Sequence, residues 1–250
     1  MDVLLFGGQS NMRGTSRSFP QDVIDFDDVY EYRFNTKSVQ LLKHPCGEHI
    51  GEDLLHRASD GNGCMIPDFC RAYKIARPVK IMTAHVAKGG SMLWEWEKGC
   101  ERYNAARDKM LEAIKEAEKI EPVEHIYYMW LQGESDAVYR TSEDEYYKRL
   151  IDYKNALKED LHIEKFGIIR VGYFSKEDEE YDHAIQRAQE RCVKDDEDFL
   201  MLTRVCEFLS KDKFFINPEH RGHYNNNALA IMGNIAGEYL SRYAIGEIKR

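Results

Sequence analysis

The sequence has no long hydrophobic run and no basic stripe, and each absence narrows the class of protein. Its apolar runs, such as Val3–Phe6, span only a handful of residues, far short of the ~20 that a membrane helix needs. Its 35 lysines and arginines are interleaved with 44 acidic residues, and the net charge of −9 disfavours binding to nucleic-acid phosphates or anionic membranes. We therefore expect no nucleic-acid partner, no membrane partner and a small-molecule ligand.

Paired cysteine motifs and metal-binding histidine spacings are missing too. The cysteines at 46, 64, 70, 100, 192 and 206 contain no CxxC pair, and the nine histidines form no HxH or HExxH spacing. We interpret the cysteines as small buried hydrophobic residues and expect no cofactor and no metal. No signal-peptide pattern precedes the first apolar run, which predicts a cytoplasmic protein if Met1 is the native start. A mature secreted form with a new Met would look identical.

What the sequence does contain is a regular alternation of short apolar runs and amphipathic helical patterns. Continuous apolar runs are typical of strands buried on both faces, and they lie at 3–6, 79–86, 126–131, 166–173 and 199–203. Helical stripes lie at 103–117, 146–161, 184–192 and 226–243, the second opened by a capping box of Ser142 and Glu145. The pattern predicts one α/β domain over residues 1–250, a three-layer α/β/α sandwich around a mainly parallel five-stranded sheet. Oligomeric state stays open.

Residues 13–62 depart from this alternation. The segment is polar and broken by glycine and proline, with short strands expected only at Val29–Phe34 and Val39–Leu42. A long irregular insertion inside a domain is unusual unless it serves a functional site or its rim. We expect this insertion to frame the pocket of the functional site.

Polar residues follow several of the predicted strands. Function in parallel α/β sheets gathers beyond the carboxyl ends of the strands. Gly7-Gly8-Gln9-Ser10 follows the first strand, Gly89-Gly90-Ser91 the second and Gln132-Gly133-Glu134-Ser135-Asp136 the third, while His223 lies just before the last helix. Taken singly, each segment fits an ordinary turn, helix cap or acidic loop. Together they supply a hydroxyl, backbone and amide donors, a carboxylate and an imidazole.

This combination resembles the SGNH-hydrolase superfamily, specifically the carbohydrate-esterase branch with sialate O-acetylesterases and acetylxylan esterases. The matching motifs are GQSNM at 8–12, GGSMLWEW at 89–96, WLQGESD at 130–136, IQRAQ at 185–189 and HYN at 223–225. They run from the first strand to the last helix, so the resemblance covers nearly the whole chain. It implies the flavodoxin-like sheet order of that superfamily.

The resemblance also implies roles for individual residues. Ser10 would be the nucleophile and His223 its general base, because a serine hydroxyl needs a hydrogen-bonded base to become reactive. The oxyanion donors would be the N–H groups of Ser10 and Gly90 and the side-chain amide of Gln132. Substrate contacts would come from three further motif residues, namely Asn11, Trp94 and Trp96.

The acid that orients the histidine departs from the family pattern. Many members carry Asp three residues before the catalytic histidine, where this chain has His220. Glu134 or Glu219 could take that place, and a Ser–His dyad without an acid is a third alternative. We favour Glu134, because it lies inside the matched QGESD motif.

The predicted function is removal of O-acetyl groups from a carbohydrate through an acyl-enzyme on Ser10. Acetylated sialic acid, xylan and related sugars all fit, and an arginine in the pocket, such as Arg13 or Arg140, would favour the carboxylate of sialate. The alternative, motivated by the absent Asp, is a carbohydrate-binding relative of the same fold with impaired catalysis.

Overall fold

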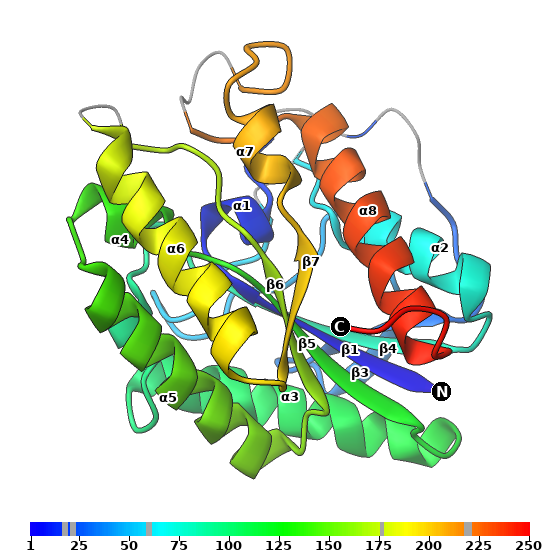
Figure 1. Ribbon diagram of the computed structural model, residues 1–250. Helices are drawn as coiled ribbons and strands as arrows, with labels where there is room; N and C mark the ends of the chain where they lie inside the picture. The colour runs from blue at the N-terminus through cyan, green and yellow to red at the C-terminus, as the bar shows by residue number, and fades with distance from the viewer. Residues whose placement is uncertain (17–19, 21–23, 59–61, 176–177, 218–221) are drawn as a thin grey trace.

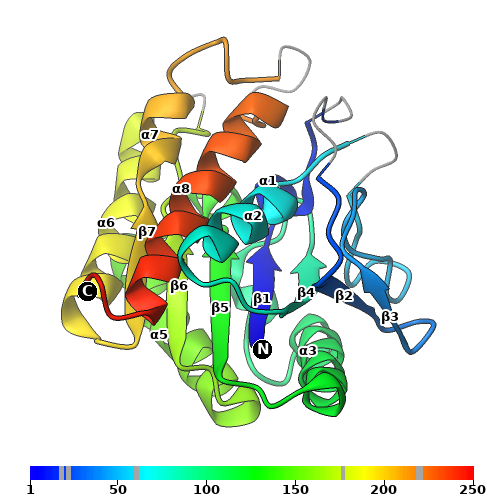
Figure 2. The same cartoon turned by 90° about the vertical axis from the view of Figure 1, so that its right-hand side faces the viewer.

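Seven strands form one sheet in the order β3-β2-β4-β1-β5-β6-β7 (Figures 1 and 2). The structure is a computed structural model and describes residues 1–16, 20, 24–58, 62–175, 178–217 and 222–250. The strands are β1 (Asp2–Gly8), β2 (Val29–Arg33), β3 (Ser38–Leu41), β4 (Ile81–Ala87), β5 (His125–Leu131), β6 (Lys165–Ile169) and β7 (Phe199–Thr203). The helices are α1 (Ser10–Arg13), α2 (Ile66–Ala76), α3 (Glu101–Ile120), α4 (Glu134–Val138), α5 (Glu143–Leu161), α6 (Glu179–Asp195), α7 (Val205–Leu209) and α8 (Asn226–Ala244), with a 3-10 helix η1 (Leu93–Trp96).

The three central strands, β4, β1 and β5, are parallel and end at the same level. Gly8 at the end of β1 pairs with Ala87 of β4 on one side and with Leu131 of β5 on the other. The loops that follow these strands therefore leave the sheet at one edge, as the sequence predicts. The predicted α/β sandwich with a mainly parallel sheet is confirmed.

The predicted strand number is wrong, because the sheet has seven strands and not five. The two additional strands come from the insertion: β2 pairs in parallel with β4, and β3 pairs antiparallel with β2. The sequence analysis treats these segments as short local strands. They extend the main sheet because the hydrophobic side chains of β2, such as Val29 and Tyr32, are fully buried against it.

Helices cover both faces of the sheet, with α2 and α8 on one face and α3, α5 and α6 on the other (Figures 1 and 2). Aromatic side chains of the central strands pack against helices on both faces. Phe6 meets the ring of Phe69 in α2 edge-on at 5.1 Å, whereas on the opposite face Trp130 of β5 packs on Tyr153 of α5 at 4.9 Å. The predicted cap of α5 is present, since the Ser142 hydroxyl accepts a hydrogen bond from the Glu145 N–H.

Two glycines let α8 approach α2 closely. A Cβ atom at Gly237 would lie 2.2 Å from the carbonyl oxygen of Phe69, and one at Gly233 would lie 2.5 Å from that of Met65. The close packing of α8 on α2 therefore depends on the absence of a side chain at both positions. Within the described residues, no helix has the length and apolar character needed to cross a membrane.

Candidate active site

Ser10 and His223 lie side by side although 213 residues separate them in the chain. Ser10 begins α1 directly after β1, and His223 lies just before Asn225, the residue that caps the N-terminus of α8. The Ser10 Oγ and the His223 Nε2 are 2.9 Å apart, a hydrogen-bond distance. An imidazole nitrogen in this position can accept the proton of the hydroxyl, which is the activation that a serine nucleophile requires.

The Ser10–His223 pair opens into a cavity of about 730 Å³, within the range of small-molecule sites. Its walls come from the end of β1, the insertion, the loop after β4, α4 and the loop after β6. The lining residues are Gln9, Ser10, Arg13, Thr15, His56, Asn62, Lys88, Gly89, Gly90, Ser135, Val138, Tyr139, Phe174 and His223. The insertion therefore contributes to the pocket wall, as expected.

A buried hydrogen-bond chain fixes the loop that carries His223. The Asn11 Nδ2 donates to the Glu134 Oε1 at 2.7 Å and to the carbonyl of Gly222 at 3.2 Å. The Asn11 Oδ1 accepts from the Tyr224 N–H at 3.3 Å. Asn11 thus holds the residues on both sides of His223, and it does not line the cavity, so its predicted substrate contact does not fit this geometry.

Glu134 acts on this loop through Asn11 and makes no direct hydrogen bond to His223. Its carboxyl group is buried at the start of α4, and its Oε2 has no hydrogen-bond partner among the described residues. Burial raises the pKa of Glu134 to about 7, against the opposing effect of the Asn11 amide. The predicted role of Glu134 as the acid that orients His223 is therefore not supported by its contacts. Glu219, the other predicted acid, lies outside the described residues.

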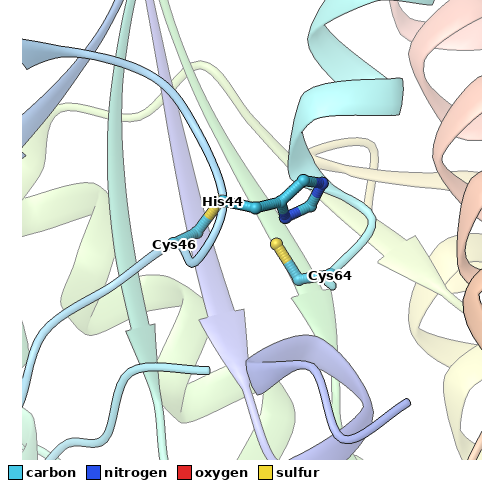
Figure 3. A group of neighbouring side chains, drawn as sticks. All are labelled: His44, Cys46 and Cys64. Atoms are coloured by element: carbon cyan, nitrogen blue, oxygen red, sulfur yellow. The ribbon is translucent and has the colours of Figure 1, made fainter. Parts of the chain in front are cut away.

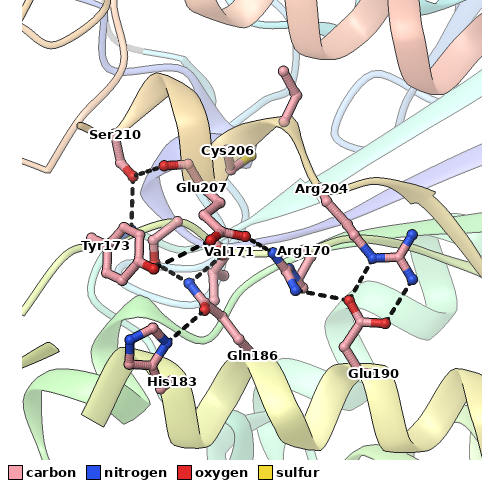
Figure 4. A network of polar contacts seen from close by, with 12 residues as sticks. Arg170, Val171, Tyr173, His183, Gln186, Glu190, Arg204, Cys206, Glu207 and Ser210 are labelled. Atoms are coloured by element: carbon pink, nitrogen blue, oxygen red, sulfur yellow. Dashed lines mark hydrogen bonds and ion pairs between the residues drawn. The ribbon is translucent and has the colours of Figure 1, made fainter. Parts of the chain in front are cut away.

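The loop after β6 packs against the imidazole and is itself held by polar contacts. The Phe174 ring meets the His223 ring edge-on at 5.5 Å, and the Phe174 N–H donates to Asp182 of α6 at 3.0 Å. Figure 4 shows the neighbouring network, in which Gln186 of α6 donates to the Val171 carbonyl at 3.2 Å. This network ties the end of β6 to the helices around it, so Phe174 is a fixed wall beside His223.

A glycine turn after β4 lies next to Ser10. A Cβ atom at Gly89 would lie 3.7 Å from the Cβ of Ser10, and Gly90 has a φ of 75°, a conformation that glycine adopts readily. The turn is anchored by Asp136, whose carboxylate accepts from the Leu93 N–H at 3.0 Å. Gly90 therefore lines the cavity near Ser10, and its oxyanion role stays a prediction.

The amide of Gln132 does not fit its predicted role as an oxyanion donor. Its Nε2 donates to the Ser91 carbonyl at 3.0 Å and to the Asp136 Oδ2 at 2.6 Å, so both of its N–H bonds are used. Gln132 is fully buried and does not line the cavity. Its contacts hold the Gly90 turn in place instead.

Gln9 offers the side-chain amide that Gln132 does not. The Gln9 Oε1 accepts from the Gly133 and Ser135 N–H groups at 3.3 and 3.1 Å, and Gln9 lines the cavity beside Ser10. Among the described residues, its Nε2 hydrogen-bonds to no acceptor. Gln9 is not among the site residues predicted from the sequence, although it stands directly before Ser10 in the GQSNM motif.

The two tryptophans of the GGSMLWEW motif lie away from the cavity. Trp96 is fully buried, donates from Nε1 to the Ser91 Oγ at 3.0 Å and packs edge-on against Trp130 at 5.4 Å. Trp94 is 49% exposed and is not part of the cavity wall. The 3-10 helix η1 turns both side chains away from Ser10, so their predicted sugar contacts do not fit. Val138, Tyr139 and Phe174 provide the apolar surface in the cavity.

The cavity wall carries basic side chains and, among its lining residues, no carboxylate. Arg13, Lys88 and His56 line it. Asp53, which is not part of the lining, pairs with Lys88 and lies 3.3 Å from the His56 Nε2. The Arg13 Nε donates to the Arg57 carbonyl at 2.8 Å, which fixes the guanidinium in the wall. Burial lowers the pKa of His56, and the nearby charges of Lys88 and Arg13 lower it further. Arg140, the other predicted arginine, lies over the Tyr181 ring at 5.0 Å and is not part of the cavity wall.

Comparison with solved structures supports the same fold. A protein from Arabidopsis thaliana superposes with a TM-score of 0.74 at 17% identity, over 97% of this chain and 98% of that chain. NanS superposes with a TM-score of 0.67 at 13% identity, over 98% of each chain. A carbohydrate acetylesterase from Xanthomonas citri gives a TM-score of 0.62 at 14% identity, over 98% of this chain and 57% of that chain.

Sequence comparison identifies the family. No curated protein matches the chain. The family model described as "Carbohydrate esterase, sialic acid-specific acetylesterase" matches residues 1–236, nearly the full length. With the esterase-like arrangement at the sheet edge and the SGNH-type fold, this match shows that the chain belongs to the carbohydrate esterase family of sialic acid-specific acetylesterases.

Proposed function

We propose that this protein hydrolyses O-acetyl esters of an acidic sugar, with Ser10 as the nucleophile. The observation that carries the proposal is the 2.9 Å contact between the Ser10 Oγ and the His223 Nε2 at the floor of a cavity. A hydroxyl paired in this way with an imidazole is the reactive unit of serine esterases.

The reaction proceeds in two acyl transfers. The Ser10 Oγ attacks the acetyl carbonyl while His223 takes its proton, and the sugar hydroxyl then leaves with that proton. Water, activated by the same imidazole, attacks the acetyl-serine and releases acetate. No cofactor takes part in either step.

Three donors around Ser10 stabilise the negative charge that develops on the carbonyl oxygen. They are the N–H groups of Ser10 and Gly90 and the Nε2 amide of Gln9, which replaces Gln132 in this role. Gln9 is held by the backbone at the start of α4, so its N–H groups are in place before the substrate arrives. Donors fixed in advance are the ones that lower a barrier most.

The basic side chains of the wall favour a sugar that carries a carboxylate, as sialic acid does. Arg13 and Lys88 line the cavity that Ser10 opens into, and Lys88 also forms an ion pair with Asp53. A guanidinium binds a carboxylate by paired, charge-assisted hydrogen bonds, which are stronger than neutral ones. Acetylated xylan is uncharged at its backbone sugars, so such hydrogen bonds would not strengthen its binding.

Replacement of Ser10 tests the assignment. We expect Ser10→Ala to lower the rate of acetate release from p-nitrophenyl acetate and from O-acetylated sialic acid by about 10⁴-fold or more. A fluorophosphonate probe should label the wild type at Ser10 and leave the variant unlabelled, with Ser38→Ala on β3 as the control. Wild-type rates in Ser10→Ala would overturn the proposal, and calorimetry showing sugar binding without acetate release would favour a binding protein instead.

A further inference from the structure

A second group of reactive side chains lies outside the cavity. His44, Cys46 and Cys64 place one nitrogen and two sulfur atoms within 4.8 Å of one another. Figure 3 shows the three side chains pointing toward a common centre. Both cysteines are buried. His44 and Cys46 belong to the insertion, and Cys64 lies just beyond its end. None of them lines the cavity.

The fold brings these residues together from two places in the chain. His44 and Cys46 follow β3, and Cys64 lies just before α2. Cys64 also packs against the end of α1, since a Cβ atom at Gly14 would lie 2.8 Å from its Cβ. The segment between Cys46 and Cys64 carries His56 and Asn62, which are part of the cavity wall.

The donor set matches the preference of one metal. Two thiolates and an imidazole are zinc ligands, and tetrahedral zinc accepts them with a fourth position left for water. Two thiolates and a neutral imidazole around Zn²⁺ carry no net charge, which suits a buried position, because burial penalises uncompensated charge. Binding of Zn²⁺ by Cys46 and Cys64 displaces their thiol protons to solvent and changes no oxidation state.

We propose that His44, Cys46 and Cys64 form a structural zinc site. The metal would join the residues after β3 to the residues before α2, and so close the loop that carries His56 and Asn62 to the cavity. It takes no part in acyl transfer, so its presence is independent of the proposed esterase function.

Zinc titration of the reduced protein tests the site. We expect one Zn²⁺ per chain in calorimetry with a non-thiol reductant, and a rise in Tm of about 5–10 °C at a hundredfold excess of zinc over its Kd. Co²⁺ in place of zinc should give the intense near-ultraviolet bands of thiolate-to-metal charge transfer. That spectrum requires no variant, so it stays informative if a substitution prevents folding.

Single substitutions locate the ligands. Cys46→Ser and Cys64→Ser should each weaken zinc binding by about 100-fold and abolish the cobalt spectrum, whereas Cys100→Ser, at a partly exposed cysteine outside the group, should leave both unchanged. Wild-type protein that binds no zinc below about 10 µM would overturn the proposal. So would unchanged binding in the serine variants, or a Cys46–Cys64 disulfide found by peptide mapping of the protein as isolated.

Discussion

The cavity has two walls of different construction. The strand-end wall (Gln9, Ser10, Gly90, Ser135 and His223) stands on loops that follow the central strands or precede α8, and the insertion wall (Arg13, Thr15, His56 and Asn62) belongs to residues 13–62. Buried hydrogen bonds to the main chain hold the strand-end wall, as between Gln9 and the Ser135 N–H. The insertion wall is held through charged side chains, as where the Arg13 guanidinium donates to the Arg57 carbonyl and His56 lies 3.3 Å from Asp53.

The difference separates two tasks. Reactive groups need fixed mutual geometry, because a small displacement of a catalytic group costs a large part of the rate. The strand-end wall provides this geometry through strands that end in register. The insertion wall contributes charge to the cavity, and charge there changes which sugars bind. Substitutions in the first wall should therefore change turnover, and substitutions in the second should change affinity.

Among substitutions in the strand-end wall other than at Ser10, we expect the largest effect on turnover at Gln9. Gln9→Glu keeps an oxygen to accept the Gly133 and Ser135 N–H bonds but removes the amide donor. We expect kcat on p-nitrophenyl acetate to fall about 100- to 1000-fold with KM little changed, because an oxyanion donor acts in the transition state.

Gln132 provides the matched comparison. Gln132→Ala removes bonds that hold the Gly90 turn, so we expect a loss of about 1–3 kcal/mol in the free energy of unfolding and a fall in kcat of less than tenfold. Urea denaturation and initial rates measure the two quantities. Near-normal kcat in Gln9→Glu together with a hundredfold loss in Gln132→Ala would restore the original assignment of the oxyanion donor.

A smaller effect is expected in the insertion wall. Arg13→Gln removes a charge from the cavity, and we expect KM for O-acetylated sialic acid to rise about 10- to 100-fold, the value of one charge-assisted hydrogen bond. Rates on p-nitrophenyl acetate and on acetylated xylooligosaccharides should not change. Arg140→Gln, at an arginine outside the cavity, serves as control. Equal losses on charged and uncharged esters would show that Arg13 supports the fold of the wall and does not select the substrate.

The smallest effect on turnover is expected at Glu134. A substitution there should change the free energy of unfolding instead. Because burial raises its pKa to about 7, the folded protein binds this proton more tightly than the unfolded chain, and the stability it contributes is lost as pH rises from about 4.5 through about 7. Glu134→Gln resembles the protonated form. We expect it to match the wild type at pH 4.5 and to exceed it by about 3 kcal/mol at pH 8 in urea denaturation. A difference that is constant with pH would contradict this.

The sequence predicts the catalytic part of the fold well for a physical reason. Buried parallel strands read as continuous apolar runs, so five strands and the long helices between them are visible without tertiary information. Strands β2 and β3 are visible only as local strands, because β4, the strand that joins β2 to the rest of the sheet, lies far along the chain. The periodicity of the sequence does not predict which strands pair.

The site could be predicted in part, and the failures share one cause. Ser10 and Gly90 follow strand ends, so the strand-end rule is enough to place them near one another. The direction of a side chain on such a loop depends on its neighbours: Gln132 turns toward Ser91, and Trp96 turns into the core. The approach of Cys64 to Cys46 depends on the path of the whole insertion, which no short spacing motif encodes.

The close packing of α8 on α2 has a consequence for synthesis on the ribosome. His223 stands directly before α8, and α8 reaches its place only by closing on α2 through Gly233 and Gly237. A nascent chain that still lacks α8 therefore holds Ser10 without His223 fixed beside it. Under the proposed function, we expect such a chain to cleave no ester until α8 has docked on α2.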